Sequence, residues 1–201
     1  MQAKRTTQRG FTLLELMITV AVAGTLAAIA VPNMRDFMRN NRLSSAANDM
    51  LRSVQVARSE AVKRQRVMAA CASSNPNADD ATCSDGAFSG WIVFQDSNGN
   101  WTRDPGDATE VVIDRKNVAN GVTVRNDSTG KVSYNATGFA TSTPGQVPTS
   151  RIVICDARGL RPVGDNSVAR ALVIEQTGRA RTTRVQQEVS DALDDIGGTC
   201  P

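Results

Sequence analysis

The chain has 201 residues, of which 40% are hydrophobic and 21% charged, as in one folded domain with an added element; this excludes disordered and collagen-like proteins. Its 23 basic and 20 acidic residues give a formal net charge of +3, so overall charge indicates no class of partner. The chain contains no histidine, which excludes serine-histidine catalysis and histidine-bearing metal sites, and we expect no enzyme, metal or cofactor.

A long apolar segment occupies residues 11–31, FTLLELMITVAVAGTLAAIAV, and as a helix it would cross about 30 Å of hydrocarbon. Lys4, Arg5 and Arg9 precede it, so the positive-inside rule predicts a cytoplasmic N-terminus and an external position for the rest of the chain. A secretory signal peptide with an alanine-rich cleavage site is the alternative. Glu15 argues against it, because a carboxylate costs about 2.5 to 3.5 kcal/mol in an apolar helix and therefore needs a partner.

The residues around Gly10 resemble the processing site of type IV prepilins: a short basic leader ends in Gly10, and FTLLELMITVAVAGTLAAIAVP begins at Phe11. In that family a prepilin peptidase cleaves after the glycine and methylates the new terminal amine, here that of Phe11. The family's glutamate five residues into the mature chain, here Glu15, contacts the N-terminus of a neighbouring subunit during assembly. The resemblance thus implies a leader at residues 1–10, with the peptidase and other pilins as partners.

The same resemblance implies where the protein resides. Before assembly, the chain is expected to be a single-pass protein of the inner membrane with a periplasmic head. After assembly through the N-terminal helix, it is expected in an extracellular pilus. Residues 11–32 would form the transmembrane and assembly half of that helix.

Residues 33–66 carry the helical pattern beyond the apolar segment. Apolar side chains recur there at intervals of three and four residues, interleaved with arginines and lysines. We interpret this segment as an amphipathic continuation of the helix to about Arg64. Its basic face is expected to be a solvated or subunit-facing surface, with nucleic-acid binding as the alternative.

Residues 67–201 change to a period of two, in short runs separated by glycine, proline, asparagine and aspartate. The predicted fold class is therefore α+β, with the long N-terminal helix packed on a β-rich globular head of antiparallel sheets. Within the head, ARSEAVKR before a strand, GWIVFQDSNGN, ICDARG and EQTGRAR resemble the minor pilins and pseudopilins of the GspH/FimT group. This resemblance implies the type IV pilin fold.

Four cysteines follow the membrane-type segment, and an external compartment favours disulfides over free thiols. Cys71 and Cys83 flank a polar loop, Cys155 closes a strand-like run, and Cys200 is penultimate. We favour the pairs 71–83 and 155–200. Four cysteines permit three pairings, and the sequence alone does not decide among them.

The segment from Asp96 to Asp107 is rich in side-chain oxygens. DSNGN at 96–100, followed by Asp104 and Asp107, has the alternating oxygen ligands of a calcium loop. It lacks a glutamate at the closing position, so we favour a hairpin turn and place no metal there.

The basic residues are most concentrated at 151–184, where seven arginines face three acidic residues. Arginine suits phosphate because its guanidinium keeps its charge and donates bidentate hydrogen bonds. In GRAR at 178–181, strand alternation would place Arg179 and Arg181 on one face, and Gly178 would allow a turn close to a ligand. No aromatic residue lies beside the motif in the sequence, so base stacking is not expected and a single subunit should bind weakly. The alternative is that these arginines pair with acids near the C-terminus, Glu188, Asp191, Asp194 and Asp195.

FimT-type minor pilins linked to natural transformation carry a C-terminal G-R-x-R motif that binds DNA, and GRAR matches it at Gly178, Arg179 and Arg181. The resemblance implies a minor type IV pilin that captures extracellular DNA through its phosphate backbone for uptake. We assign three further arginines as auxiliary contacts: Arg184, Arg158 and Arg161. The alternative is a subunit without DNA binding, either a priming or tip minor pilin or a minor pseudopilin of type II secretion.

Overall fold

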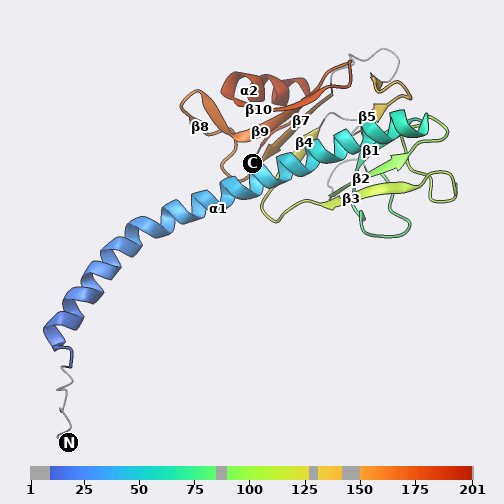
Figure 1. Cartoon of the computed structure of the whole chain (residues 1–201). Helices are drawn as coiled ribbons and strands as arrows, with labels where there is room; N and C mark the ends of the chain where they lie inside the picture. Colours follow the sequence, from blue (N-terminus) through green and yellow to red (C-terminus); the bar gives the residue numbers. More distant parts are fainter. Residues whose placement is uncertain (1–9, 85–89, 127–130, 142–149, 201) are drawn as a thin grey trace, which may run out of the picture. The chain divides into compact units, whose positions relative to one another are not determined.

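The computed structural model describes residues 10–84, 90–126, 131–141 and 150–200. It divides into two compact units, Met1–Arg39 and Asn40–Pro201. The second unit, here called the head, joins part of a long helix to antiparallel sheets (Figure 1). The predicted α+β class, a long N-terminal helix and a β-rich head of antiparallel sheets, is confirmed, whereas residues 1–9 of the predicted leader lie outside the described residues.

Helix α1 extends from Leu13 to Arg64 and is the one described helix long and apolar enough to cross a membrane. Its first turn is closed by Thr12 and Glu15 in a reciprocal capping pair. The Glu15 backbone N–H donates to Thr12 Oγ1 at 3.2 Å, and the Thr12 N–H donates to Glu15 Oε2 at 3.5 Å. Within a single chain, the Glu15 carboxylate therefore has a local role at the start of the helix.

The second half of α1 buries one face in the head. Its buried side chains recur at three- and four-residue intervals and are mostly small, which lets the helix approach the sheets closely. They are Leu43, Ala46, Ala47, Met50, Ser53, Val54, Ala57 and Ala61. This stripe packs into a core that both sheets supply, for example through Tyr134 and Leu172.

The first sheet contains five described strands in the order β3-β2-β1-β5-β6, and all of its pairings are antiparallel. The strands are β1 (Met68–Ser73), β2 (Gly90–Gln95), β3 (Val112–Asn117), β5 (Lys131–Tyr134) and β6 (Ala140–Thr141). The turn between β5 and β6 is short and lies at the edge of this sheet. This turn contacts the turn between β9 and β10, because the Ala140 N–H donates to the Gln176 carbonyl.

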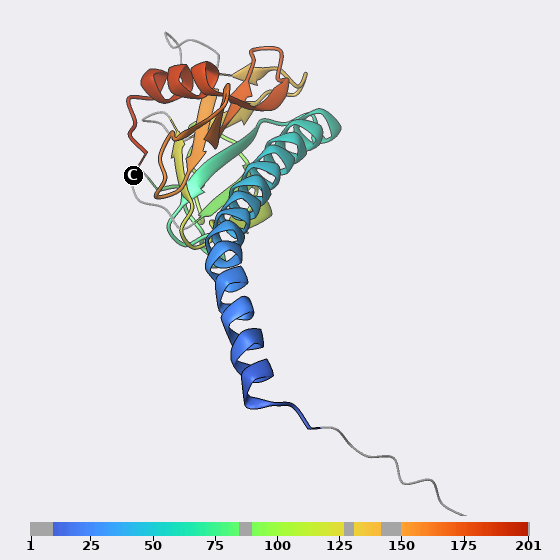
Figure 2. The same cartoon turned by 90° about the vertical axis from the view of Figure 1, so that its left-hand side faces the viewer.

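The second sheet has the order β10-β9-β7-β4, with β8 paired to β9, and it is also antiparallel. Its strands are β4 (Thr123–Asn126), β7 (Ser150–Cys155), β8 (Pro162–Val163), β9 (Asn166–Ile174) and β10 (Ala180–Val185). Figures 1 and 2 show this sheet between α1 and a second helix, α2 (Gln186–Asp195). Val189, Ala192 and Leu193 of α2 pack on the face of β7 and β9 that is turned away from α1. The sequence interpretation did not include α2.

Two disulfides tie the head together. Cys71 is bonded to Cys83 and Cys155 to Cys200, which are the two pairs favoured from the sequence. The first closes the loop after β1. The second holds the segment after α2 to the end of β7, because Cys155 is that strand's last residue.

The loop from Asp96 to Glu110 connects the antiparallel strands β2 and β3, as predicted for a hairpin. Both carboxylate oxygens of Asp96 accept backbone hydrogen bonds, from Gly99 at 2.8 Å and Trp101 at 2.9 Å. Glu110, only 1% exposed, accepts from the backbone N–H of Asp104. The acidic side chains of this loop therefore stabilise its own turns.

Candidate nucleic-acid interface

The predicted GRAR motif forms the turn between β9 and β10 and the first residues of β10. The Gly178 N–H donates to the Glu175 carbonyl at 2.8 Å, and the Glu175 N–H donates to the Arg179 carbonyl at 2.9 Å. Gly178 has φ +79°, a backbone conformation that residues with a Cβ rarely adopt. The motif is thus presented on a closed hairpin turn.

Gly178 is buried, and the space beside it is filled by the turn between β5 and β6. A Cβ on Gly178 would lie 2.0 Å from the carbonyl oxygen of Gly138. The Ala140 N–H donates to the Gln176 carbonyl at 3.1 Å, which joins the two turns directly. The close approach that the glycine allows is therefore to the protein's own backbone, whereas the sequence suggested an approach to a ligand.

Arg58 of α1 completes this junction and was not identified from the sequence. Its Nε donates to the Gly138 carbonyl at 3.0 Å, and its NH2 group donates to the Thr177 carbonyl at 2.9 Å. One guanidinium thereby holds both turns. A lone arginine in an amphipathic helix gives no sequence signal for such a role, because both acceptors lie about 80 residues or more away.

The arginines of the motif differ in their surroundings. Arg179 and Arg184 are exposed and form no ion pair with any residue that the structure describes. The NH1 group of Arg181 lies 2.8 Å from Glu188 Oε2 of α2, and both side chains remain about two-fifths exposed at 42% and 41%. The hydrogen bond from Arg181 is the main reason that the pKa of Glu188 lies below its ordinary value, with Thr183 also contributing. The predicted pairing with C-terminal acids is thus realised at Arg181 alone within the motif.

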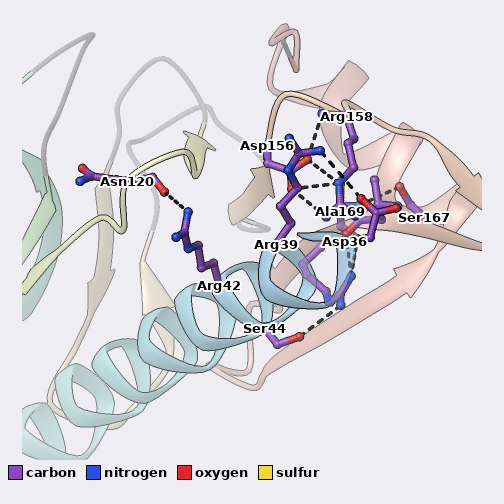
Figure 3. Close-up of polar contacts among 11 residues, drawn as sticks. Asp36, Arg39, Arg42, Ser44, Asn120, Asp156, Arg158, Ser167 and Ala169 are labelled. Atoms are coloured by element: carbon purple, nitrogen blue, oxygen red, sulfur yellow. Dashed lines mark hydrogen bonds and ion pairs between the residues drawn. The ribbon is translucent and has the colours of Figure 1, made fainter. Parts of the chain in front are cut away.

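Arg158 is not available as an auxiliary phosphate contact, which corrects its predicted role. Its Nε lies 3.0 Å from Asp156 Oδ1 and its NH2 group 2.7 Å from Oδ2, in a bidentate pair. The two side chains are 7% and 6% exposed. Figure 3 shows the two side chains of this pair in contact with each other. Arg161 is exposed in the segment that leads into β8.

Arg170 accounts for another part of the basic excess, because this residue of β9 is buried (6% exposed). Its NH1 group donates to the Val168 carbonyl at 2.7 Å and its NH2 group to Ser44 Oγ at 3.2 Å. Burial, together with the nearby charges of Arg184 and Arg158, lowers the pKa of Arg170 to about 10. Arg151 is also occupied, by Asp195 at 2.8 Å. The exposed basic surface is therefore smaller than the arginine count suggested.

Two family models match this sequence. "Type II transport protein GspH" matches residues 46–178, and "Prokaryotic N-terminal methylation motif" matches residues 5–31. The second match includes Gly10, Phe11 and Glu15. The first ends at Gly178, so the arginines of GRAR lie just beyond it.

The known proteins to which this sequence is similar include fimbrial proteins. The chain is 51% identical over 41 residues to fimbrial protein EcpC of Eikenella corrodens, covering 20% of this chain and 27% of the relative. It is 30% identical over 94 residues to a fimbrial protein of Pseudomonas aeruginosa, covering 45% and 61%. The chain thus spans less than two thirds of the length of these relatives.

Among solved structures, the type IV minor pilin FimU of Pseudomonas aeruginosa is similar, with a TM-score of 0.49 and 23% identity over 73% of this chain and 92% of FimU. The family assignment rests on the sequence models. The GspH match covers well over half of the chain and includes most of the buried face of α1 and most of both sheets. The chain therefore belongs to the GspH family and is a type IV pilin-like protein of the GspH/FimT group, a minor pilin or pseudopilin.

Proposed function

We propose that the chain is processed after Gly10, is N-methylated at Phe11 and is assembled through α1 into a filament. Residues 1–10 would be the leader, residues 11–32 the membrane and assembly half of the helix, residues 33–66 its amphipathic half, and residues 67–201 the β-rich part of the head. The match to the N-terminal methylation motif supports the processing site. Prepilin peptidase and other pilins are the partners that follow from it.

The apolar surface of α1 supports assembly through this helix. In the first unit, large apolar side chains are 49% to 82% exposed in the isolated chain. Such a continuous apolar surface needs a cover, either lipid or other subunits. We propose that Glu15, which caps its own helix in the single chain, contacts the N-terminus of a neighbouring subunit in the filament.

We further propose that the head binds extracellular DNA for uptake, and that retraction of the filament carries the DNA inward. The observation that carries this proposal is the exposure of Arg179 beside Arg181 on a turn that Arg58 holds in place. Arg184 adds a third cation on β10. These guanidiniums favour phosphate oxygens, so binding should be independent of sequence and sensitive to salt.

DNA binding by the full chain in neutral detergent is expected to weaken with salt. Log affinity should fall by about 0.9 for each log unit of salt and each phosphate contact. The double variant Arg179→Ala/Arg181→Ala should reduce this slope by about 2 and lower affinity by about tenfold or more at low salt, because two phosphate contacts are lost. Fluorescence anisotropy of a labelled duplex across a salt series measures both quantities.

The matched control removes the same charge from exposed arginines of α1, in the double variant Arg42→Ala/Arg52→Ala. It should keep the wild-type slope. Equal losses in the two double variants would mean that net charge, and not the GRAR turn, governs binding. Unchanged binding in Arg179→Ala/Arg181→Ala would refute the site.

Glu188 is expected to restrain DNA binding, because its carboxylate competes with phosphate for Arg181. The variant Glu188→Gln should therefore bind DNA about 2- to 5-fold more tightly, the size typical of an exposed ion pair. The wild-type protein should show the same gain at acidic pH as Glu188 is protonated, which occurs at a lower pH than for an ordinary glutamate because its pKa is lowered. Anisotropy titrations at several pH values test both effects.

Asp191→Asn is the control for Glu188→Gln. It removes one negative charge from the same helix, but Asp191 accepts from Gln187 rather than from an arginine. A gain confined to Glu188→Gln identifies competition at Arg181. The same gain in both variants would reduce the effect to the overall charge of α2.

A structural subunit without DNA binding is the second candidate, as a priming or tip minor pilin or a minor pseudopilin of type II secretion. It is favoured by the description of the matching family as a type II transport protein and by the end of that match at Gly178. In this case Arg179 and Arg184 would face another subunit. Absence of salt-sensitive DNA binding by the wild-type chain would decide for this candidate.

A further inference from the structure

The turn between β5 and β6 exposes an aromatic ring. Phe139 is 50% exposed, and it is the one exposed aromatic residue among the described residues of the head. Its backbone is fixed, because its N–H donates to Asn135 Oδ1 at 3.0 Å and its carbonyl accepts from the Asn135 N–H at 3.0 Å. The ring therefore stands on a rigid turn and pays little ordering cost on binding a ligand.

This ring lies next to the proposed phosphate contact, although 40 residues separate the two in the sequence. Gly138 and Gly178 are in backbone contact, and Phe139 and Arg179 each follow one residue later. Each residue lies one Cα step, about 3.8 Å, from the contact between the two glycines. Three or four nucleotides of a strand, at roughly 3.4 Å each, are therefore long enough to reach from one side chain to the other. The fold thus places an aromatic side chain close to a cation that has no ion pair among the described residues, within reach of one short stretch of a nucleic-acid strand.

We propose that Phe139 stacks on an unpaired base while Arg179 binds an adjacent phosphate. The two turns would then bind single-stranded DNA in preference to duplex DNA. This inference rests on the proposed DNA binding at Arg179 and specifies its substrate. Aromatic side chains bind single strands by stacking on any base, since every base has a π-face. In a duplex the bases are already stacked on each other, and only phosphates remain for this site.

The test compares two ligands of equal charge, a labelled 20-nucleotide oligothymidine and an abasic strand of the same length. The full chain in neutral detergent is titrated as wild type and as Phe139→Ala, Phe139→Leu and Phe139→Tyr. Wild type and Phe139→Tyr should bind oligothymidine at least about fivefold more tightly than the abasic strand. Phe139→Ala and Phe139→Leu should lose this preference and keep the affinity for the abasic strand, because the arginines are untouched.

Phe139→Leu keeps an apolar side chain at the position, so its result separates ring stacking from burial of apolar surface. Retention of the oligothymidine preference in Phe139→Leu, or its absence in wild type, would overturn the stacking role and leave the phosphate contacts intact. Failure of wild type to bind either strand would refute DNA binding itself. A thermal unfolding curve for each variant confirms that the turn is folded.

Discussion

Replacing Gly178 by alanine is expected to lower the free energy of unfolding of the head by about 2 to 5 kcal/mol. One part of this cost is the left-handed backbone at φ +79°, which a Cβ disfavours. The larger part is the contact with the Gly138 carbonyl, 2.0 Å from the new Cβ, because a backbone group cannot rotate away as a side chain can. Urea unfolding followed through the fluorescence of buried Trp91 measures the change.

Gly121→Ala is the matched control. Gly121 has φ +80° and no other group within 4 Å of an added Cβ, so the substitution imposes the backbone cost alone, about 1 to 2 kcal/mol. The excess in Gly178→Ala then reports the contact between the two turns. Equal losses in the two variants would show that the turns are not held together as described.

Gly178→Ala also distinguishes the role of the glycine in the motif from the role of the arginines. Arg179 and Arg181 remain in this variant, but the turn that presents them must move away from Gly138 and from the guanidinium of Arg58. The glycine of GRAR is thus required by the fold itself. A role in DNA binding is not needed to explain it.

Elements whose buried apolar residues recur at regular intervals could be predicted from the sequence. The stripe from Leu43 to Ala61 repeats at helical spacing because one face of α1 lies in the core, and β1 and β2 are apolar because both of their faces are covered. Helix α2 was missed for a physical reason. Its ten residues are too short to be helical by propensity alone, and three apolar residues among acids reveal it only once β7 and β9 supply the packing surface.

The candidate site was predicted less completely, because charge counts contain no information on burial. Arg158 and Arg170 contribute to the basic excess of 151–184 but are turned into the head, one against Asp156 and one against carbonyls and Ser44. No aromatic residue lies beside GRAR in the sequence. Phe139 lies near GRAR only because the two turns are in contact in the fold, and no local sequence pattern indicates such a long-range contact.

Removing the Cys155–Cys200 disulfide in Cys155→Ala/Cys200→Ala is expected to cost about 4 kcal/mol of unfolding free energy. The bond links residues 45 apart, so its loss gives the unfolded chain a large gain in entropy. In the folded state Cys155 is fully buried beside Val189 and Ala192, and Cys200 holds the segment after α2 to β7. Urea unfolding of the oxidised protein measures the loss.

The second disulfide serves as an internal control, because it closes a much shorter loop. Cys71→Ala/Cys83→Ala removes a link between residues 12 apart and should cost about 3 kcal/mol, roughly 1 kcal/mol less than the first pair. Only the first variant should also release α2, whose amides should then exchange with deuterium faster than those of β1 and β2. Since Glu188 lies on α2 and restrains Arg181, this release should also raise DNA affinity. A loss of stability without faster exchange in α2 would separate the C-terminal disulfide from the helix and remove that link to the site.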